Sequence, residues 1–439
     1  MTKIIHLPFC FYPDPMGGTE VYVEALAREL TRLGIINIIC APSASNQAYT
    51  YNQLSIRRFA LNQEIKHLKE IYGEGDEKGA LEFTCILETE KPDLIHLHAF
   101  TRGVSLKLVR IAKAKGIPVI FTYHTPTVSC QRGTLLRWGE QICDGKIELS
   151  KCTACTLHSL GVNPSLAQAI TNLPPIVSQA VTKFNLQGGI WTALQMSELV
   201  KLRSQALQNL MKEVDHIIAV CDWVKDVLTI NQVPPDKITV IRQGLCQELP
   251  QSTPLNPSQN DTQPLRLVFF GRVDRTKGIH IVLNALATNP NLNVRLDIYG
   301  ICQGDSSYQQ QIKKLIEKDK RVFLKNPVPS SQVVETMRNY DMLVVPSQWL
   351  ETGPMVILEA FAAQIPVIGS NLGGIAELVR DNVNGVLVEA SCLASWARVI
   401  QSFCEHPEKI EDLRSGISVP MMMDKVAERM KVIYNDFSN

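Results

Sequence analysis

Residues 342–363 read Met-Leu-Val-Val-Pro-Ser-Gln-Trp-Leu-Glu-Thr-Gly-Pro-Met-Val-Ile-Leu-Glu-Ala-Phe-Ala-Ala, and the fold can be predicted outward from this stretch. The apolar run 342–345 predicts a buried strand of a parallel sheet. Pro354 predicts the first residue of a helix, because the N–H group that proline lacks would have no partner at that position. A strand, a short loop and a helix N-terminus are therefore expected here. Open α/β sheets bind ligands at such places, and exposed N–H groups there attract phosphate.

Two glutamates bracket the predicted loop and helix start. Glu351 lies in the loop, and Glu359 lies roughly 7–8 Å deeper along the helix axis at 1.5 Å per residue. A carboxylate accepts hydrogen bonds from hydroxyl groups but does not hold phosphate. One acid on each side of an anion site suits a ligand with hydroxyl-bearing groups on both sides of a diphosphate, such as a nucleotide sugar. The alternative is that Glu351 is a first-turn helix acid and Glu359 belongs to a solvated face.

Length and composition indicate a globular protein of several domains. The chain has 439 residues, of which 45% are hydrophobic and 20% charged, and its formal net charge is +1. The length predicts two or more domains, and the near-neutral charge gives no electrostatic case for nucleic acid. No apolar stretch approaches the ~20 residues of a membrane span, and the first residues do not resemble a signal peptide, so a cytoplasmic protein is expected.

The first half opens with a strand over residues 3–8, the pair Gly17-Gly18 and a helix. This βαβ opening lacks the GxGxxG pattern of dinucleotide-binding proteins, so the glycine pair is either a plain turn or a ligand loop. A later strand over residues 117–126 carries His124 at its carboxyl end. A single histidine is usually structural, but the carboxyl end of a strand is the ligand-binding edge of such a sheet.

The pattern restarts after residues 251–264, which are rich in Pro, Ser, Asn and Gln and predict an inter-domain linker. Residues 265–270 then form a new first strand. Gly271-Arg272-Val273-Asp274-Arg275-Thr276-Lys277-Gly278 follows as a glycine-bounded turn into a helix. Its basic residues Arg272 and Lys277 lie at a strand end, which suits binding of an anion better than a solvated face does.

Four of the twelve cysteines fall in one loop-rich stretch, where Cys130, Cys143, Cys152 and Cys155 have the spacing C-x12-C-x8-C-x2-C. One CxxC pair with two outlying cysteines can form a tetrahedral structural zinc site. The alternatives are free thiols, a redox pair, a disulfide or iron–sulfur ligation. Most of the other cysteines lie in apolar contexts and are interpreted as small buried thiols.

Two motifs carry a resemblance to a known family. Glu351, seven residues, Glu359 and then Ala-Phe-Ala-Ala-Gln-Ile-Pro-Val-Ile-Gly-Ser-Asn-Leu-Gly-Gly-Ile-Ala-Glu resembles the retaining glycosyltransferases of family four, group 1 type, and so does the G-R-x-x-x-x-K-G turn. The resemblance implies the GT-B architecture, an α/β fold in which two Rossmann-like domains face each other across a cleft. The implied parts are an N-terminal acceptor domain at 1–250 with a cysteine-containing insertion at about 128–160, the linker 251–264, a nucleotide-sugar domain at 265–415 and a terminal helix at 416–439 that returns to the first domain.

The resemblance also implies roles for the candidate site residues. Glu351 would contact the donor sugar, Glu359 the nucleotide ribose, and Arg272 and Lys277 the diphosphate, while His124 would lie next to the donor sugar. The remaining donor-binding positions would be Gly17, Gly18, Val328, Gly353, Pro354, Met355 and Val356.

One departure from the family limits what the resemblance says about the donor. Many relatives read Glu-x-Phe-Gly where this chain has Glu-Thr-Gly-Pro at 351–354. Proline donates no N–H, so one backbone contact to the sugar is lost or supplied elsewhere. The identity of the donor is therefore not copied from relatives.

The predicted function is transfer of a sugar from a nucleotide diphosphate donor, UDP- or GDP-linked, to an acceptor hydroxyl, with retention implied by the resemblance. No Asp-x-Asp motif stands out, so no cofactor or metal is expected in catalysis. The acceptor would be a saccharide, a lipid-linked saccharide or a small molecule, with neither nucleic acid nor a membrane span involved; peripheral membrane contact is compatible with this reading. The alternatives are a nucleotide-sugar-binding protein without transfer activity and an NAD-dependent oxidoreductase, which the missing GxGxxG disfavours.

Overall fold

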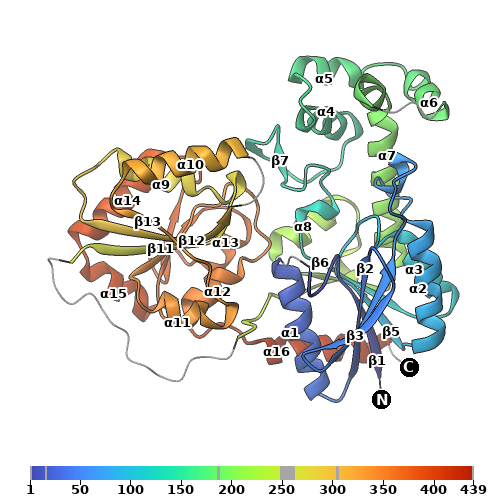
Figure 1. Cartoon of the computed structure of the whole chain (residues 1–439), viewed down its shortest axis with the longest axis horizontal. Helices are drawn as coiled ribbons and strands as arrows, with labels where there is room; N and C mark the ends of the chain where they lie inside the picture. Colours follow the sequence, from blue (N-terminus) through green and yellow to red (C-terminus); the bar gives the residue numbers. More distant parts are fainter. Residues whose placement is uncertain (1, 15–16, 185–187, 248–262, 303–305, 438–439) are drawn as a thin grey trace. The chain divides into compact units, whose positions relative to one another are not determined.

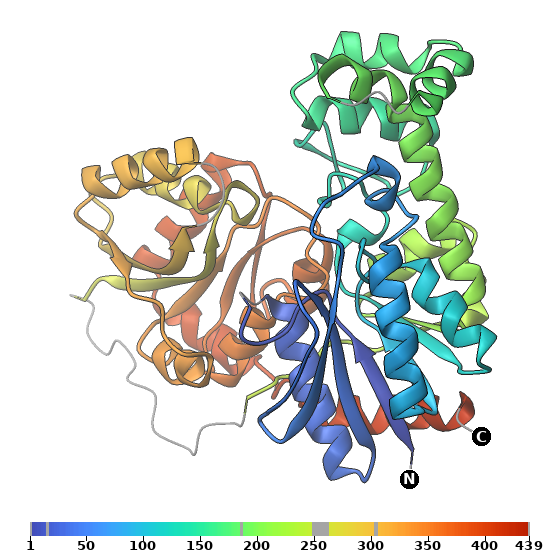
Figure 2. The same cartoon turned by 45° about the vertical axis from the view of Figure 1, so that its right-hand side comes forward.

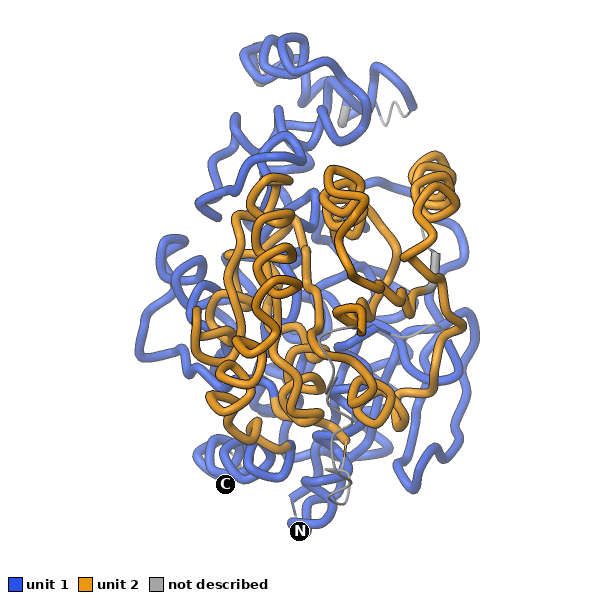
Figure 3. Tube along the Cα trace, turned by 90° about the vertical axis from the view of Figure 1, so that its left-hand side faces the viewer, with its two compact units in different colours: residues 1–243, 423–439 blue, residues 244–422 orange. Residues whose placement is uncertain are grey.

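The chain divides into two compact units in the computed structural model, which describes residues 2–14, 17–184, 188–247, 263–302 and 306–437. Unit 1 comprises residues 1–243 and 423–439, and unit 2 comprises residues 244–422 (Figure 3). The chain therefore leaves unit 1 after residue 243, where the sequence had placed the end of the first domain at residue 250. It returns to unit 1 at Met423, where the sequence had placed the start of the terminal helix at residue 416. All but the last two positions of the predicted linker, 251–264, lie outside the described residues. No helix in the described part of the chain is both long and apolar enough to cross a membrane.

Unit 1 is built on an eight-stranded sheet in the order β10-β9-β6-β5-β1-β2-β4-β3. Neighbouring strands pair in parallel except for the antiparallel edge pair β3–β4, and the inner strands are buried runs of Ile, Leu and Val, as expected for strands covered on both faces. The strands are β1 (Lys3–Leu7), β2 (Ile36–Ser43), β3 (Gln47–Tyr51), β4 (Leu54–Ala60), β5 (Leu94–Leu97), β6 (Val119–Tyr123), β9 (His216–Ala219) and β10 (Ile238–Val240).

Helices cover this sheet and also extend beyond it (Figure 1). The helices are α1 (Gly18–Arg32), α2 (Glu77–Glu90), α3 (Leu106–Ala114), α4 (Leu149–Ser159), α5 (Pro164–Thr171), α6 (Pro175–Lys183), α7 (Gly189–Glu213), α8 (Asp222–Ile230) and α16 (Met423–Phe437). The short elements are the 3₁₀ turns η1 (Leu68–Glu70), η2 (Pro126–Val128) and η3 (Pro235–Lys237) and the hairpin strands β7 (Leu136–Arg137) and β8 (Gln141–Ile142). Helix α16 packs on α1, and its Tyr434 is fully buried and hydrogen-bonded to His96 at 2.7 Å.

Helices α4, α5 and α6 and the N-terminal part of α7 form a helical lobe at the end of α7 that points away from the sheet (Figures 1 and 2). The lobe has a small core of its own, in which Ala154, Leu157, Ala167, Met196 and Leu199 are buried. Its helices continue beyond residue 160, where the sequence placed the end of the insertion.

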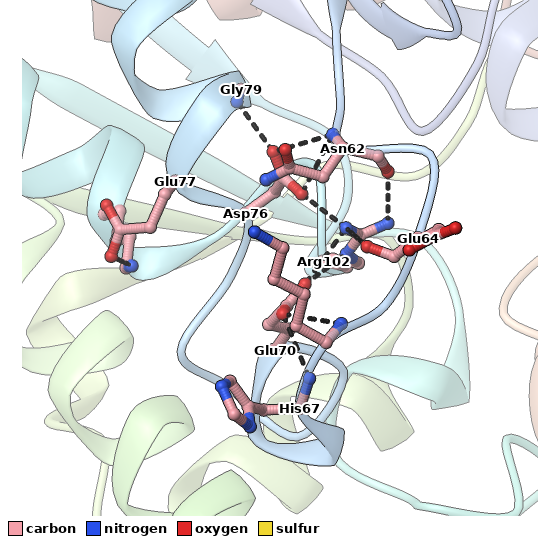
Figure 4. Close-up of polar contacts among 10 residues, drawn as sticks. Asn62, Glu64, His67, Glu70, Asp76, Glu77, Gly79 and Arg102 are labelled. Atoms are coloured by element: carbon pink, nitrogen blue, oxygen red, sulfur yellow. Dashed lines mark hydrogen bonds and ion pairs between the residues drawn. The ribbon is translucent and has the colours of Figure 1, made fainter.

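A buried ion-pair network fixes the loop that precedes α2 (Figure 4). The Asp76 carboxylate, whose side chain is 0% exposed, accepts a hydrogen bond from Arg102 at 2.5 Å and caps α2 by accepting from the Gly79 N–H at 2.7 Å. Arg102 also donates to the Glu70 carboxylate at 3.1 Å and to the Asn62 carbonyl at 3.1 Å. Arg102 thereby holds three positions of the segment 62–76, which lie 26–40 residues before it in the sequence.

Unit 2 is a six-stranded, all-parallel sheet in the order β13-β12-β11-β14-β15-β16. Numbered within the unit, this is the doubly wound order 3-2-1-4-5-6, in which the chain reverses its direction of progress between the two central strands. The strands are β11 (Leu265–Val273), β12 (Val294–Cys302), β13 (Val322–Lys325), β14 (Met342–Val345), β15 (Val367–Ser370) and β16 (Gly385–Val388). The helices and 3₁₀ turns are η4 (Arg275–Lys277), α9 (Ile279–Ala287), α10 (Ser306–Lys318), η5 (Ser330–Gln332), α11 (Val333–Met337), α12 (Met355–Ala362), α13 (Gly373–Leu378), α14 (Leu393–Glu405) and α15 (Glu408–Ser415).

Candidate active site

The predicted anion-binding residues of unit 2 lie at the topological switch point of its sheet. Strands β11 and β14 are neighbours, and the loops after them meet, because the Gln348 N–H donates to the Thr276 carbonyl at 2.7 Å. Gly278 makes this approach possible: its φ is +71°, and a Cβ there would lie 1.9 Å from the Pro346 carbonyl oxygen. The crevice outside the carboxyl ends of strands at a switch point is where doubly wound sheets bind ligands.

Lys277 and Glu351 are brought together as an ion pair. The Lys277 ammonium lies 2.6 Å from Glu351 Oε1, and the two side chains are 21% and 8% exposed. The same oxygen accepts hydrogen bonds from Ser347 Oγ and Trp349 Nε1, each at 2.8 Å. The carboxylate is therefore held by three donors, and the Lys277 ammonium also lies 5.8 Å from the centre of the Trp349 ring.

Arg272 lies at the end of β11 on the same edge of the sheet. Its Nε is 3.3 Å from the Asp274 carboxylate, and half of its side chain is exposed. Asp274 in turn accepts hydrogen bonds from the Thr276 and Lys277 N–H groups at 2.9 and 3.1 Å, which forms the 3₁₀ turn η4. One carboxylate thus shapes the turn that positions both predicted phosphate-binding cations.

The helix after β14 begins one residue later than the sequence predicted. Pro354 is the N-cap with ψ 112°, and Met355 is the first helical residue, because the proline adopts an extended rather than a helical conformation. Gly353 precedes it with φ +152°. Gly374 N–H donates to the Glu351 carbonyl at 2.7 Å, and a Cβ on Gly374 would lie 2.8 Å from Gly353 N. The start of α12 is therefore packed closely against α13.

Glu359 lies inside the second turn of α12, and its environment is unusual for a carboxylate. Burial raises the pKa of Glu359 to about 7, and the hydrogen bond that its Oε1 accepts from Gln247 at 2.9 Å only partly opposes that shift. Val328, predicted near the nucleotide base, follows β13 and packs against the apolar core beside this helix. The residues of α12 expected to take part through their N–H groups, Met355 and Val356, are partly exposed.

In unit 1 the predicted residues also lie at the carboxyl ends of strands. Gly17 is the N-cap of α1 and donates its N–H to Glu20 at 2.9 Å, and Gly18 is the first residue of that helix. His124 directly follows β6 and is buried. The Nε2 atom of His124 lies 3.0 Å from the Nδ1 atom of His98.

An asparagine at one end of a histidine chain sets the direction of its hydrogen bonds. Asn37 Nδ2 donates to Thr31 Oγ1 at 3.0 Å and to the Ile35 carbonyl at 2.9 Å, which identifies the other amide atom as the oxygen. That oxygen lies 3.0 Å from His6 Nε2. Because an amide oxygen can only accept, His6 carries its proton on Nε2.

The direction of hydrogen-bond donation set at Asn37 continues along the histidine chain to His124. Burial lowers the pKa of His6 to about 4 and that of His124 to about 3, and lowers that of His98 well below its usual range, so all three imidazoles are neutral at neutral pH. A neutral His6 with its proton on Nε2 accepts at Nδ1, so His98 Nε2, 3.1 Å away, must donate. His98 then accepts at Nδ1 from His124 Nε2, and the lone pair of His124 is left on Nδ1.

A trio of histidines has the spacing of a metal site but is already engaged in hydrogen bonds. Ligand atoms of His6, His96 and His98 lie within 4.8 Å of one another. His96 bonds Tyr434 through Nδ1 at 2.7 Å and Thr122 through Nε2 at 2.6 Å, and both nitrogens of His6 and His98 serve the chain described above. All six ring nitrogens have protein partners, so we interpret the trio as a hydrogen-bonded cluster.

Sequence reasoning found the charged residues at the switch point but missed those that position them. Ser347 and Trp349, which donate hydrogen bonds to Glu351, lie within four residues of it in the sequence. Asp274 lies inside the recognised basic turn. The signal that could have identified such residues is a polar side chain at the end of a strand. Gln247 and His6 had no such signal, whereas His98, which directly follows β5, had it and was missed because its partners are distant in sequence. The four cysteines line one cavity in unit 1, described below.

Models of two families match the chain. "Glycosyltransferase Family 4" matches residues 16–173, and "Glycosyl transferases group 1" matches residues 254–417. A D-inositol 3-phosphate glycosyltransferase of Streptosporangium roseum is 32% identical over 425 residues, 91% of this chain and 83% of the relative. The protein of the same name from Arthrobacter sp. (strain FB24) is 25% identical over 415 residues, 90% of this chain and 84% of the relative.

Two solved structures share the fold at low identity. Sucrose-phosphate synthase from Thermosynechococcus elongatus superimposes with a TM-score of 0.66 at 16% identity over 99% of each chain. Anabaena HepE in complex with UDP superimposes with a TM-score of 0.64 at 16% identity over 99% of this chain and 100% of its own.

Proposed function

Because the chain belongs to the family 4, group 1 glycosyltransferases, we propose that it transfers a hexosyl group from a UDP- or GDP-linked sugar to an acceptor hydroxyl. The predicted family and the predicted GT-B fold are both confirmed. The protein is thus a glycosyltransferase, and the alternative of an NAD-dependent oxidoreductase is set aside. Its donor, acceptor and site residues are the subject of the proposal.

The observation that carries the proposal is the Lys277–Glu351 ion pair at the switch point of unit 2. A lysine ammonium has three donors. One is used on Glu351, which leaves two for a phosphate group while the carboxylate keeps the ammonium in place. Arg272, half exposed on the same edge, would supply a second cation, and the N–H groups at the start of α12 would add partial positive charge. Positive groups fixed in this way would stabilise the leaving diphosphate as its charge develops.

The two glutamates would read different halves of the donor. Glu359, inside α12, would accept hydrogen bonds from the ribose hydroxyls, and Glu351, held by three donors to one of its oxygens, would position the sugar. Val328 would lie beside the base, and Gly353, Pro354, Met355 and Val356 beside the diphosphate and sugar. In unit 1, His124, Gly17 and Gly18 keep the donor-side roles that the family resemblance implies, with His124 Nδ1 as the hydrogen-bond acceptor.

Relatives and structural neighbours suggest which donors and acceptors to test first. The relatives are named D-inositol 3-phosphate glycosyltransferases, and Anabaena HepE has been solved with UDP, with UDP and glucose and with UDP-glucose. UDP-sugars are therefore our first candidates, with GDP-sugars next. Polyol phosphates are the first small-molecule acceptors to test, followed by saccharides and lipid-linked saccharides. Retention of configuration and independence of metal are part of the proposal.

A ligand panel followed by turnover tests the proposal. Thermal shift with UDP-sugars, GDP-sugars and NAD should show stabilisation by one class of nucleotide sugar and none by NAD. Turnover of that donor should release nucleoside diphosphate, survive EDTA and give a product whose anomeric configuration by NMR matches the donor. Binding without either hydrolysis or transfer across the acceptor panel would instead favour a nucleotide-sugar-binding protein. Loss of turnover in EDTA that added metal restores would refute metal independence, and inversion would refute retention.

A peripheral membrane contact remains a second proposal, and the helical lobe is where an observation favours it. Eight large apolar side chains of residues 149–191 are at least 42% exposed: Leu149, Leu160, Leu166, Leu173, Ile176, Phe184, Ile190 and Trp191. These eight fall within 43 residues, against thirteen exposed large apolar side chains in the rest of the described chain, and a contiguous apolar patch would suit a partner or a lipid surface. Sedimentation with anionic vesicles tests the idea, with Ile176→Ser/Phe184→Ser expected to weaken binding; no sedimentation of the wild-type protein would refute it.

A further inference from the structure

The four cysteines singled out by their spacing line a single cavity in unit 1. Cys130 follows η2 and Cys143 follows β8, while Cys152 and Cys155 lie three residues apart on α4. All four are free thiols, and all line one cavity of about 40 Å³ between the hairpin, α4 and α7. A volume of about 10–15 Å³ holds one water molecule, so this space is larger than one metal ion requires.

The spacing of the sulfurs does not match the single zinc ion that the sequence predicted. Four thiolates at about 2.3 Å from one zinc ion lie about 3.8 Å from each other in a tetrahedron. Within the described residues, only the histidine trio brings three candidate ligand atoms within 4.8 Å of one another. No three of these cysteine sulfurs meet that limit, although all four face one space.

A group larger than a single ion fits this arrangement better. In an iron–sulfur cluster of the cubane type each thiolate binds a different iron atom, so the cysteines stand around the cluster and the cluster fills the space between them. Four cysteine ligands are what such a cluster needs. A cavity with cysteines at its wall has this form, whereas a zinc site would leave no cavity between its ligands.

Basic side chains line the cavity, which suits an anionic metal–thiolate group; two of them, Lys146 and Lys151, are also paired with Glu148 and Asp144 at 3.2 and 2.6 Å. The charged residues of its lining are all basic: Arg132, Arg137, Lys146, Lys151 and Arg203. The backbone N–H of Trp138 donates to the Cys155 sulfur at 3.4 Å. Hydrogen bonds of this kind to the ligand sulfurs tune iron–sulfur clusters.

The backbone of the segment contains little regular secondary structure, which is compatible with a metal cluster as its organising group. Between Cys130 and the start of α4 at Leu149 the chain has only two strands of two residues each. Five residues there have left-handed backbone conformations: Gly133, Leu135, Trp138, Gly139 and Gly145. Two of them, Leu135 and Trp138, carry large side chains at φ 51° and 59°, a strained conformation that persists only where the surroundings fix it.

We propose that Cys130, Cys143, Cys152 and Cys155 ligate one iron–sulfur cluster of the cubane type, which ties the loop after η2 and the hairpin to α4 at the base of the helical lobe. This proposal does not depend on the proposed transfer reaction. Its role would be structural, because its four ligands would join the loop after η2, the end of the hairpin and α4.

Metal analysis of the full-length protein purified without oxygen tests the proposal. We expect about four iron and about four acid-labile sulfide per chain, with the broad visible absorption of a cluster, and little zinc. The double variant Cys152→Ser/Cys155→Ser should lose the iron, whereas the matched control Cys85→Ser, which alters an exposed cysteine on α2, should keep it.

Three results would overturn the proposal. About one zinc per chain without sulfide would restore the zinc assignment, a Cys152–Cys155 disulfide found by mass spectrometry would favour a redox pair, and four titratable thiols without metal would exclude a site. Hydrogen exchange on the wild-type protein gives a second test that does not depend on whether the variants fold. Oxidative bleaching of the cluster should speed exchange in residues 130–155 and leave β11–β16 unchanged; unchanged exchange in 130–155 would refute the structural role.

Discussion

Replacing Glu359 by glutamine tests whether a buried carboxylate reads the ribose of the donor. Burial raises the pKa of Glu359 to about 7, so the free protein holds this group half ionised at neutral pH. Only the ionised form presents two oxygens that accept hydrogen bonds from ribose hydroxyls. Nucleotide affinity should therefore fall as the pH drops below about 7.

The size of the effect follows from that pKa. About nine-tenths of Glu359 is ionised at about pH 8 and about one-tenth at about pH 6, which weakens apparent binding about tenfold, or about 1.4 kcal/mol. Glu359→Gln removes this titration and loses a charge-assisted hydrogen bond worth about 1.5–3 kcal/mol. The variant should therefore bind the bare nucleotide much more weakly than wild type at about pH 8, and the gap should narrow at about pH 6.

Calorimetry with UDP and GDP across this pH range is the assay. The terminal phosphate of the nucleotide itself titrates near about pH 6, but it does so equally in every variant, so the difference between variants isolates Glu359. The matched control is Glu351→Gln, which should keep the wild-type pH dependence, change binding of bare nucleotide little and lower kcat through loss of sugar positioning. Equal pH dependence in wild type and Glu359→Gln would refute the assignment. If Glu351→Gln weakens binding of the bare nucleotide as much as Glu359→Gln does, the two glutamates do not contact different parts of the donor.

Four further predictions follow from other parts of the structure. Lys277→Ala should lower kcat/KM for donor turnover by the equivalent of about 2–5 kcal/mol, and near-wild-type kinetics would refute its phosphate role. Asn37→Leu removes the acceptor that orients the histidine chain, so ¹⁵N NMR of labelled histidines should show His124 in both tautomers; a pure Nε2–H form would contradict the chain. Asp76→Ala removes the cap of α2 and one of the two carboxylates that pair with Arg102, and should cost roughly 2–5 kcal/mol in urea unfolding, against at most about 1 kcal/mol for the exposed Glu77→Ala. Because burial lowers the pKa of the chain histidines, the unfolded state binds more protons below about pH 6.5, and stability should fall from there toward about pH 4; a flat urea-midpoint profile would contradict this.

The sequence was sufficient to predict the fold because its signals are local. A buried apolar run, a proline and a glycine-bounded basic turn each define a strand end or helix start within about ten residues, and two such patterns separated by a polar segment define two sheets. Local signals did not define the exact first residue of the helix at Pro354. Proline suits both the cap and the first turn, and only the observed ψ of 112° distinguishes them.

The organisation of the candidate site was less accessible from the sequence. Lys277 and Glu351 were each predicted to meet the donor, but the pattern did not show that they bind each other, because 74 residues separate them. The partner of Glu359 is Gln247, 112 residues away, and its raised pKa comes from packing that no motif records. Contacts of this kind depend on how the strands are ordered in the sheet.

The return of the chain to unit 1 also sets an order on folding during synthesis. The ribosome makes the fifteen residues of α16 after all of unit 2, yet this helix supplies the buried Tyr434 that bonds His96 and covers α1. A nascent chain that has reached residue 422 therefore holds every strand of unit 2, while the unit made first still lacks one of its helices. Most of unit 1 is translated before unit 2 but unit 1 is completed after it, so a stop codon directly after residue 422 would damage unit 1 rather than unit 2.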